Sequence, residues 1–260
     1  IGNGGELSAG LMLGPYAVAY KQTSIFLGSY VGTPVVWQWD RIPGEIGCIG
    51  PEAVCDIGGA HVFVGQDNIW MFDGTRPFPI ATGQVRQWFF DNSSAGSRYR
   101  TILKYDRQNN RVWFFYPSAS SSGACDSALV YHLVTKQWGR ANHSIECAVN
   151  FVTPGVTWDT LSSLGATWDT LPNIPWDSQA FQTGGRALAV FNTSHQLKTL
   201  TGTSTGGSIT TGDMGDDDEV GRMNQVRLRF LRAPTSATAQ GSTKMSEGDS
   251  LVVASSASLS

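Results

Sequence analysis

The feature that most constrains this chain is a repeated pattern of short apolar segments that end at turn residues. Almost every apolar stretch alternates with polar residues or is rich in aromatic ones, and is bounded by Gly, Pro, Asn or Asp. This pattern is typical of β-strands joined by tight turns. It predicts strands at Ala17–Tyr20, Ser24–Tyr30, Val35–Trp39, Ala60–Val64, Asn68–Phe72, Arg100–Tyr105, Arg111–Tyr116, Ser127–His132, Gln137–Arg140, Ala187–Phe191 and Val226–Leu231. The best helical segment is the short stretch Thr82–Phe90, where apolar residues lie three or four apart.

Several of these strands form hairpins whose turns can be recognised. Asp67-Asn68 separates the strands on either side of it, and the polar turn within Tyr105–Arg111 does the same. Strand, polar turn and strand then recur at a spacing of roughly 50 to 60 residues, which is near the size of a propeller blade. We therefore predict an all-β fold of propeller-like blades. An open sandwich is the structural alternative, and the number of blades is left open.

The domain organisation follows from changes in composition. Residues 1–200 are predicted to form the propeller-like domain, with an insertion at 156–178. Residues 201–221 form a Gly- and Thr-rich linker with an acidic run, and 222–260 are predicted to begin a second β-rich domain or platform. Because the chain starts at Ile1 and the alternating segment Leu251–Ser260 lacks a stop signal, we expect further sequence on both sides.

The insertion contains a short tryptophan repeat. Val156–Leu161, Ala166–Leu171 and Ile174–Ser178 each contain a Trp-Asp pair. The main interpretation is structural, with Trp158, Trp168 and Trp176 packing as a small ladder. The functional alternative is contact with a glycan, because exposed indole faces stack on sugar rings.

Composition excludes several classes of function. The chain has 18 Lys and Arg against 21 Asp and Glu, a net charge of −3, so it lacks the basic stripe of a general nucleic-acid binder. No apolar run approaches the roughly 18 residues of a membrane-spanning helix, so we expect no membrane span. Cys48, Cys55, Cys125 and Cys147 have neither disulfide-scaffold nor zinc-finger spacing, and are predicted to be buried free thiols. The acidic run Asp213–Glu219 lacks the spacing of a calcium loop, which favours a solvated turn over a metal site.

The chain lacks the motifs of the common catalytic classes. It contains no G-x-S-x-G elbow and no P-loop, and its four histidines have no recognisable triad context. Gly155–Trp158 and Gly165–Trp168 are similar to the core of the Asp-box of sialidases, but the preceding Ser-x-Asp is absent. A glycosidase also needs paired carboxylates across a cleft, or a tyrosine nucleophile with an arginine cluster. We therefore predict that the protein is not an enzyme and uses no cofactor.

One set of segments carries a resemblance to a known family. The segments are Tyr20-Lys21, Ile25-Phe26, Trp37–Ile42, Ile46–Gly50, Val62–Gly65, Asn68–Gly74, Pro79-Ile80, Val112–Tyr116, Ala128–Tyr131 and Gln137-Trp138. Together they resemble the β-propeller nozzle or hub proteins of short-tailed bacteriophages, also described as packaged-DNA stabilisation proteins. The resemblance covers about residues 10 to 232, and it includes Thr211–Asp213 and the Arg222–Arg232 stretch as the exit into a second β-domain.

The resemblance implies a virion structural protein of the phage tail with no catalytic residues. Its expected partners are other copies of itself in a ring, hexameric by the resemblance, a tail adaptor above, and fibres or a needle below. Viral DNA would pass through the ring without sequence-specific binding. The acidic cluster Asp216, Asp217 and Asp218 is the candidate channel charge, because like charges repel the phosphate backbone. The alternative function is a carbohydrate-active propeller, either a hydrolase or a receptor-binding module.

Overall fold

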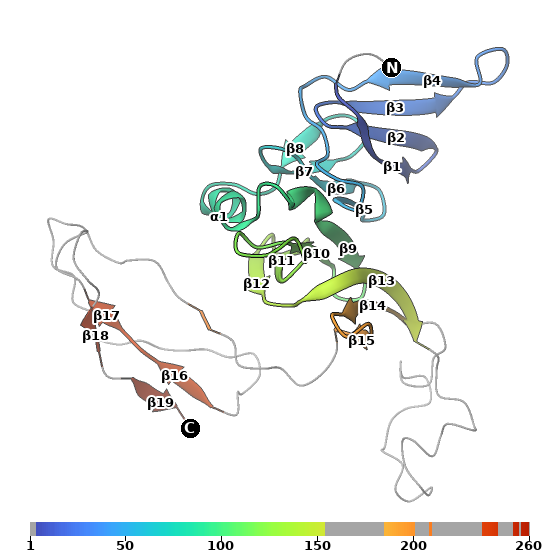
Figure 1. The fold of residues 1–260 in the computed structure, drawn as a ribbon. Helices are drawn as coiled ribbons and strands as arrows, with labels where there is room; N and C mark the ends of the chain where they lie inside the picture. The colour runs from blue at the N-terminus through green and yellow to red at the C-terminus, as the bar shows by residue number, and fades with distance from the viewer. Residues whose placement is uncertain are drawn as a thin grey trace, which may run out of the picture. The chain divides into compact units, whose positions relative to one another are not determined.

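The computed structural model describes residues 4–153, 185–200, 208–209, 236–243, 252–254 and 256–259 (Figure 1). The chain divides into two compact units, Ile1–Gly202 and Thr203–Ser260. Each unit is described by itself below.

Over its described residues, the first unit is built from four antiparallel sheets that follow one another along the chain. Within each sheet, strands adjacent in sequence are hydrogen-bonded neighbours, so each sheet is a simple meander. Sheet 1 contains β1 (Leu7–Leu13), β2 (Tyr16–Lys21), β3 (Ile25–Tyr30) and β4 (Trp37–Arg41). Sheet 2 contains β5 (Val54–Asp56), β6 (His61–Val64), β7 (Ile69–Phe72) and β8 (Pro77–Pro79). Sheet 3 contains β9 (Ile102–Asp106), β10 (Arg111–Tyr116), β11 (Ser127–His132) and β12 (Trp138–Ala141), and sheet 4 contains β13 (Ile145–Thr153), β14 (Gly185–Asn192) and β15 (Leu197–Thr199).

The prediction of an all-β fold with blade-like sheets is confirmed. A four-stranded antiparallel meander is the unit from which propellers are built, and sheets 1 to 3 are three such meanders in succession. The first strands of successive sheets start about 45 residues apart, so the repeat is shorter than the spacing predicted from the hairpins. Ten of the predicted strands overlap observed ones, while Val226–Leu231 lies outside the described residues.

The sequence pattern missed the first strand of three sheets and two short outer strands. These are β1, β5, β13, β8 and β15. β5, β8 and β15 have only three residues each, too few to show alternation. β1 does alternate, with Leu7, Ala9, Leu11 and Leu13 at every second position, and was overlooked. β4 begins at Trp37 rather than Val35, because its register against β3 pairs Trp37 with Tyr30 at the end of the ladder.

The sheets pack on one another through their first strands. β1 contacts β5, β5 contacts β9, and β9 contacts β13. Figure 1 shows the four sheets following one another in chain order, from β1–β4 at one end to β13–β15 at the other. One apolar core joins sheets 1 to 3, and a second joins sheet 3 to sheet 4. The core therefore lies between sheets, as it does between blades.

A buried hydrogen-bonded chain joins sheet 1 to sheet 2. The Tyr20 hydroxyl lies 2.8 Å from His61 Nδ1, and His61 Nε2 lies 3.0 Å from the Met12 carbonyl oxygen. Because the carbonyl can only accept, Nε2 carries the proton and the Tyr20 hydroxyl donates to Nδ1. Both side chains are fully buried, and the Tyr20 ring packs at 5.0 Å from the ring of Phe63.

The connection between sheets 2 and 3 contains the helical segments. The predicted helix Thr82–Phe90 is observed as α1 (Gln84–Asn92), two residues further along, and η1 (Arg98–Arg100) follows it. Phe89 of α1 is fully buried, with its ring 5.1 Å from that of Tyr116. Gly50, at the entry to sheet 2, lies so close to the Tyr99 carbonyl that a side chain would collide with this backbone. The connection is therefore packed against both sheets that it joins.

The second unit contains strands over the residues that the structure describes. β16 (Ala237–Ala239) pairs with β19 (Ala257–Leu259), and β17 (Ser242–Thr243) pairs with β18 (Val252–Val253), both antiparallel. Over its described residues the second unit is thus β-rich, in line with the predicted fold class. Among the described residues, no helix is long and apolar enough to cross a membrane.

Replacing His61 with Leu is expected to destabilise the first unit by about 3 kcal/mol, because the Tyr20 hydroxyl and the Met12 carbonyl lose their buried partner. Burial lowers the pKa of His61, so at pH below about 6.5 the unfolded chain binds a proton that the folded chain does not. The wild type should therefore lose stability as the pH falls from 8 to 5, and the His61→Leu variant should lose less over that range.

Urea unfolding at several pH values measures both effects. The matched control is His143→Ala, since His143 is exposed in the segment between β12 and β13. This control should keep both the stability and the pH slope of the wild type. Equal pH slopes in the wild type and in His61→Leu would show that His61 is not held neutral in the folded protein.

Candidate functional site

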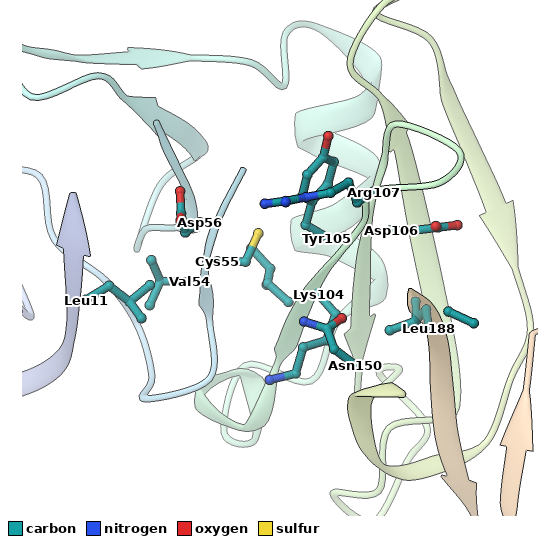
Figure 2. Close-up of a pocket in the computed structure, with 12 residues that line it drawn as sticks. Leu11, Val54, Cys55, Asp56, Lys104, Tyr105, Asp106, Arg107, Asn150 and Leu188 are labelled. Carbon is teal, nitrogen blue, oxygen red and sulfur yellow. The ribbon is translucent and has the colours of Figure 1, made fainter. Parts of the chain in front are cut away.

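One cavity of the first unit lies where the first strands of the sheets converge. Its volume is about 320 Å³, and its walls come from β1, β5, β9, β13 and β14 (Figure 2). This is the position closest to the axis about which propeller blades are arranged. A second cavity of about 320 Å³ lies between α1 and sheet 3, but it is lined mainly by apolar residues and the Arg140 side chain. The first cavity is therefore the candidate functional site.

The floor of this cavity is apolar and its sides carry charged and polar groups. The apolar lining comes from Leu11, Val54, Leu103, Ala187 and Leu188, and the polar lining from Asp56, Lys104, Tyr105, Asp106, Arg107 and Asn150. The lining contains two cationic side chains, Lys104 and Arg107, and two carboxylates, Asp56 and Asp106, so it is balanced in formal charge. Figure 2 shows the Arg107 side chain extending toward β5 across the cavity.

The charged groups of the cavity are largely engaged by local structure. Lys104 Nζ lies 2.8 Å from Glu52 Oε2, in an ion pair that links sheet 3 to the entry of sheet 2. Asp56 Oδ1 accepts the backbone N–H of Gly58 at 2.8 Å. Asp106 accepts the backbone N–H groups of Gln108 and Asn109, as the first residue of the β9–β10 turn. Aspartates at these positions fix turns, which is their common role in hairpins.

The carboxylates do not form a catalytic pair. Figure 2 shows the Asp106 carboxylate turned away from Asp56, toward β13 and β14. Glycoside hydrolysis needs two carboxyl groups facing each other across the scissile bond. The arrangement of Asp56 and Asp106 is therefore not that of a paired general acid and base.

The cysteine in the cavity wall is not a nucleophile in its resting state. Burial raises the pKa of the Cys55 thiol to about 12, despite the opposing effect of Lys104. Burial also raises the pKa of Cys48 to about 12 and that of Cys125 to about 11. All three are therefore protonated thiols at neutral pH, and behave as small apolar side chains.

The sequence-predicted cysteine environments need one correction. Cys48, Cys55 and Cys125 are buried and free, as predicted, but Cys147 is free and exposed. Its position on β13 places it with Val149 and Phe151, on the face opposite to Ala148, which packs on sheet 3. Among the described residues, no three His, Cys, Asp or Glu side chains are grouped as a metal site requires.

The site residues predicted from the sequence lie outside the described residues. This holds for the glycan candidates Trp158, Trp168 and Trp176, and for the channel cluster Asp216, Asp217 and Asp218. The cavity residues Asp56, Lys104, Arg107 and Asn150 were missed by sequence reasoning. They come from three sheets and share no motif, so only a prediction of which strands lie side by side could have grouped them.

Comparisons with known proteins do not place the chain in a family. No protein-family model matches it, and no curated protein matches it.

Thiol labelling tests the cysteine environments. In the native protein at pH 8, Ellman's reagent is expected to react rapidly with one thiol per chain, because Cys147 is exposed and the other three are buried. Cys48, Cys55 and Cys125 should react only as the protein unfolds. The Cys147→Ser variant should lose the rapid phase altogether. A second rapid thiol in the native protein would contradict the burial described here.

Proposed function

We propose that this protein is a structural subunit of a short bacteriophage tail, where it forms part of the nozzle or hub of the virion. It acts through assembly and passage of DNA rather than catalysis. The observation that carries the proposal is the series of antiparallel meanders in contact through their first strands, which is the architecture that the family resemblance implies.

The segments that carry the resemblance fall on strands of the sheets and on the link between sheets 1 and 2. Trp37–Arg41 is the outer strand β4, Ile69–Phe72 is β7, Arg111–Tyr116 is β10 and Ser127–His132 is β11. The Ile46–Gly50 segment is the link from sheet 1 to sheet 2, where the Cys48 N–H donates to the Lys21 carbonyl at 2.9 Å. The motifs are thus the parts that build and connect the blades, which supports a likeness of architecture.

The proposed partners follow from this role. Copies of the chain form a ring, with a tail adaptor above it and fibres or a needle below it. Viral DNA passes through the ring without sequence-specific contacts. A chain with net charge −3 suits such a channel, because counterion release would hold DNA on a basic wall.

The proposal predicts that the full-length native protein assembles into a ring with a central channel. Mass photometry gives the mass of the particle, and negative-stain imaging gives its shape. A mass of several subunits together with a visible channel is the expected result. A compact monomer at micromolar concentration would contradict the nozzle role.

A second prediction concerns DNA passage. Reversal of Asp216, Asp217 and Asp218 to Lys is expected to slow DNA ejection from assembled virions, because the new cations would bind phosphates. The matched control reverses three exposed acids elsewhere, Glu6, Glu45 and Asp91, and should leave ejection unchanged. Ejection at the wild-type rate in the Asp216–Asp218 variant would remove this cluster from the proposal.

Carbohydrate recognition is the second proposal, and it rests on the repeated Trp-Asp pairs that contain Trp158, Trp168 and Trp176. A glycan array separates the two roles. Binding that is specific and is lost in Trp168→Ala would favour a carbohydrate-active propeller over a nozzle subunit.

A further inference from the structure

Sheet 1 has one face that none of the other described sheets of the first unit covers. Side chains alternate across a strand, so Val18, Tyr20 and Ile25 point toward sheet 2 and their neighbours point the other way. The cross-strand pairs on this other face are Met12 with Ala17, Gly28 with Trp39, and Tyr30 with Trp37. We call this surface the end face. Its exposed large apolar members are Met12, Tyr30, Trp37 and Trp39, while Phe26, which pairs with Ala19 and Arg41 on the same face, is buried.

The end face carries an exposed group of aromatic rings. Tyr30 is 66% exposed, Trp37 40% and Trp39 37%. The two indole rings lie 6.3 Å apart and 29° from parallel, and the Tyr30 ring meets Trp37 edge-on at 5.9 Å. Large exposed apolar patches on soluble proteins mark interaction sites.

A glycine holds the Trp39 ring flat on the sheet. A Cβ at residue 28 would lie 2.9 Å from Cζ3 and Cη2 of Trp39 and 3.0 Å from Cε3. Such a contact is shorter than real Cβ atoms allow, so the ring occupies the space above Gly28. Trp39 nevertheless remains 37% exposed.

The equivalent faces of the other described sheets are all covered. In sheet 2, this face carries His61 and Phe63, which pack under Tyr20 of sheet 1. In sheet 3, Phe114 and Leu129 belong to the core shared with sheets 1 and 2. In sheet 4, Ala148, Leu188 and Val190 pack against Phe115 and Ala128 of sheet 3. In sheets 2 to 4, this face thus packs against the opposite face of the preceding sheet, which we call the outer face of that sheet. Among the described residues, the end face of sheet 1 has no preceding sheet to cover it.

The last sheet of the series presents the complementary surface. On the face of sheet 4 opposite to the one that packs on sheet 3, Cys147 of β13, Phe191 of β14 and Leu197 of β15 are cross-strand neighbours. Cys147 and Leu197 are exposed, and Phe191 is half-buried. This row lies on the outer face of sheet 4. The equivalent outer faces of sheets 1, 2 and 3 cover sheets 2, 3 and 4.

We propose that the end face of one copy of this chain packs against the outer face of sheet 4 of a second copy, head to tail. The contact continues, between copies, the sheet-on-sheet packing that joins the four described sheets of the first unit. Because the two surfaces differ, the interface is heterologous and produces a closed ring or a filament rather than a two-fold dimer. The inference deepens the proposed function and rests on it, since it names the surfaces through which the proposed ring would assemble.

Cross-linking between the two surfaces tests this contact. Cys147 already supplies an exposed thiol on the outer face of sheet 4, and Tyr30→Cys places a second thiol on the end face. With a short bismaleimide, the full-length Tyr30→Cys protein is expected to form a ladder of covalent dimers, trimers and larger species. Adding Cys147→Ser should abolish the ladder, because the thiol introduced on the end face would then have no partner.

The other outcomes of this experiment overturn the proposal. A monomer that migrates faster shows closure within one chain, and a dimer that persists with Cys147→Ser shows pairing of two end faces. Absence of cross-links, when maleimide labels both thiols, shows that the surfaces do not meet. Val134→Cys is the matched control, because Val134 is 72% exposed in the turn after β11 and should give no ladder.

A second variant separates this inference from the nozzle role. Trp37→Lys is expected to reduce the ring to monomers by mass photometry, while Val134→Lys leaves it intact. Rings that persist in Trp37→Lys would keep the nozzle role but overturn the end-face contact. A wild-type protein that forms no ring would overturn the nozzle role itself. Glycan binding that is lost in Trp37→Lys without a change in mass would assign the end face to carbohydrate instead.

Discussion

The first unit depends on the burial of sheet faces against one another. No single sheet of three or four short strands can bury both of its faces, so each becomes stable only when a neighbour covers it. The contact between sheets 1 and 2 shows how specific this packing is, because the Tyr20–His61–Met12 chain satisfies its polar groups within an apolar core. A shift of one residue in either sheet would break these hydrogen bonds.

This packing also explains where the candidate sites lie. The first strands converge, so charged residues at their ends gather around one cavity even though they are far apart in sequence. The same packing leaves the series of described sheets with two unlike ends, one rich in exposed aromatic rings and one with the Cys147–Phe191–Leu197 row. The cavity and the two exposed faces thus lie in different parts of the same unit.

Much of the fold was predictable because the hairpins carry their own signals. Asp67-Asn68 and the Asp106 turn specify local reversals, and the alternating strands β10 and β11 specify which residues face inward. The shortest strands lack such a signal. β5 has three residues, and only its pairing with β6 and its contacts with β1 and β9 define it. The free thiols illustrate the same limit, since Cys147 has an apolar neighbourhood in sequence but lies on an outer face.

The sequence by itself determined the all-β class, the hairpins and the short helix, because each depends on residues within a few positions of one another. Only the tertiary structure decided that Lys104, Arg107 and Asn150 share a cavity with Asp56, and that Trp37 and Trp39 are exposed while Phe63 and Phe114 are buried. Alternation shows that a side chain lies on one of two faces, but whether that face is covered depends on which sheet packs against it. That choice is made by contacts between distant segments, and a local pattern does not contain it.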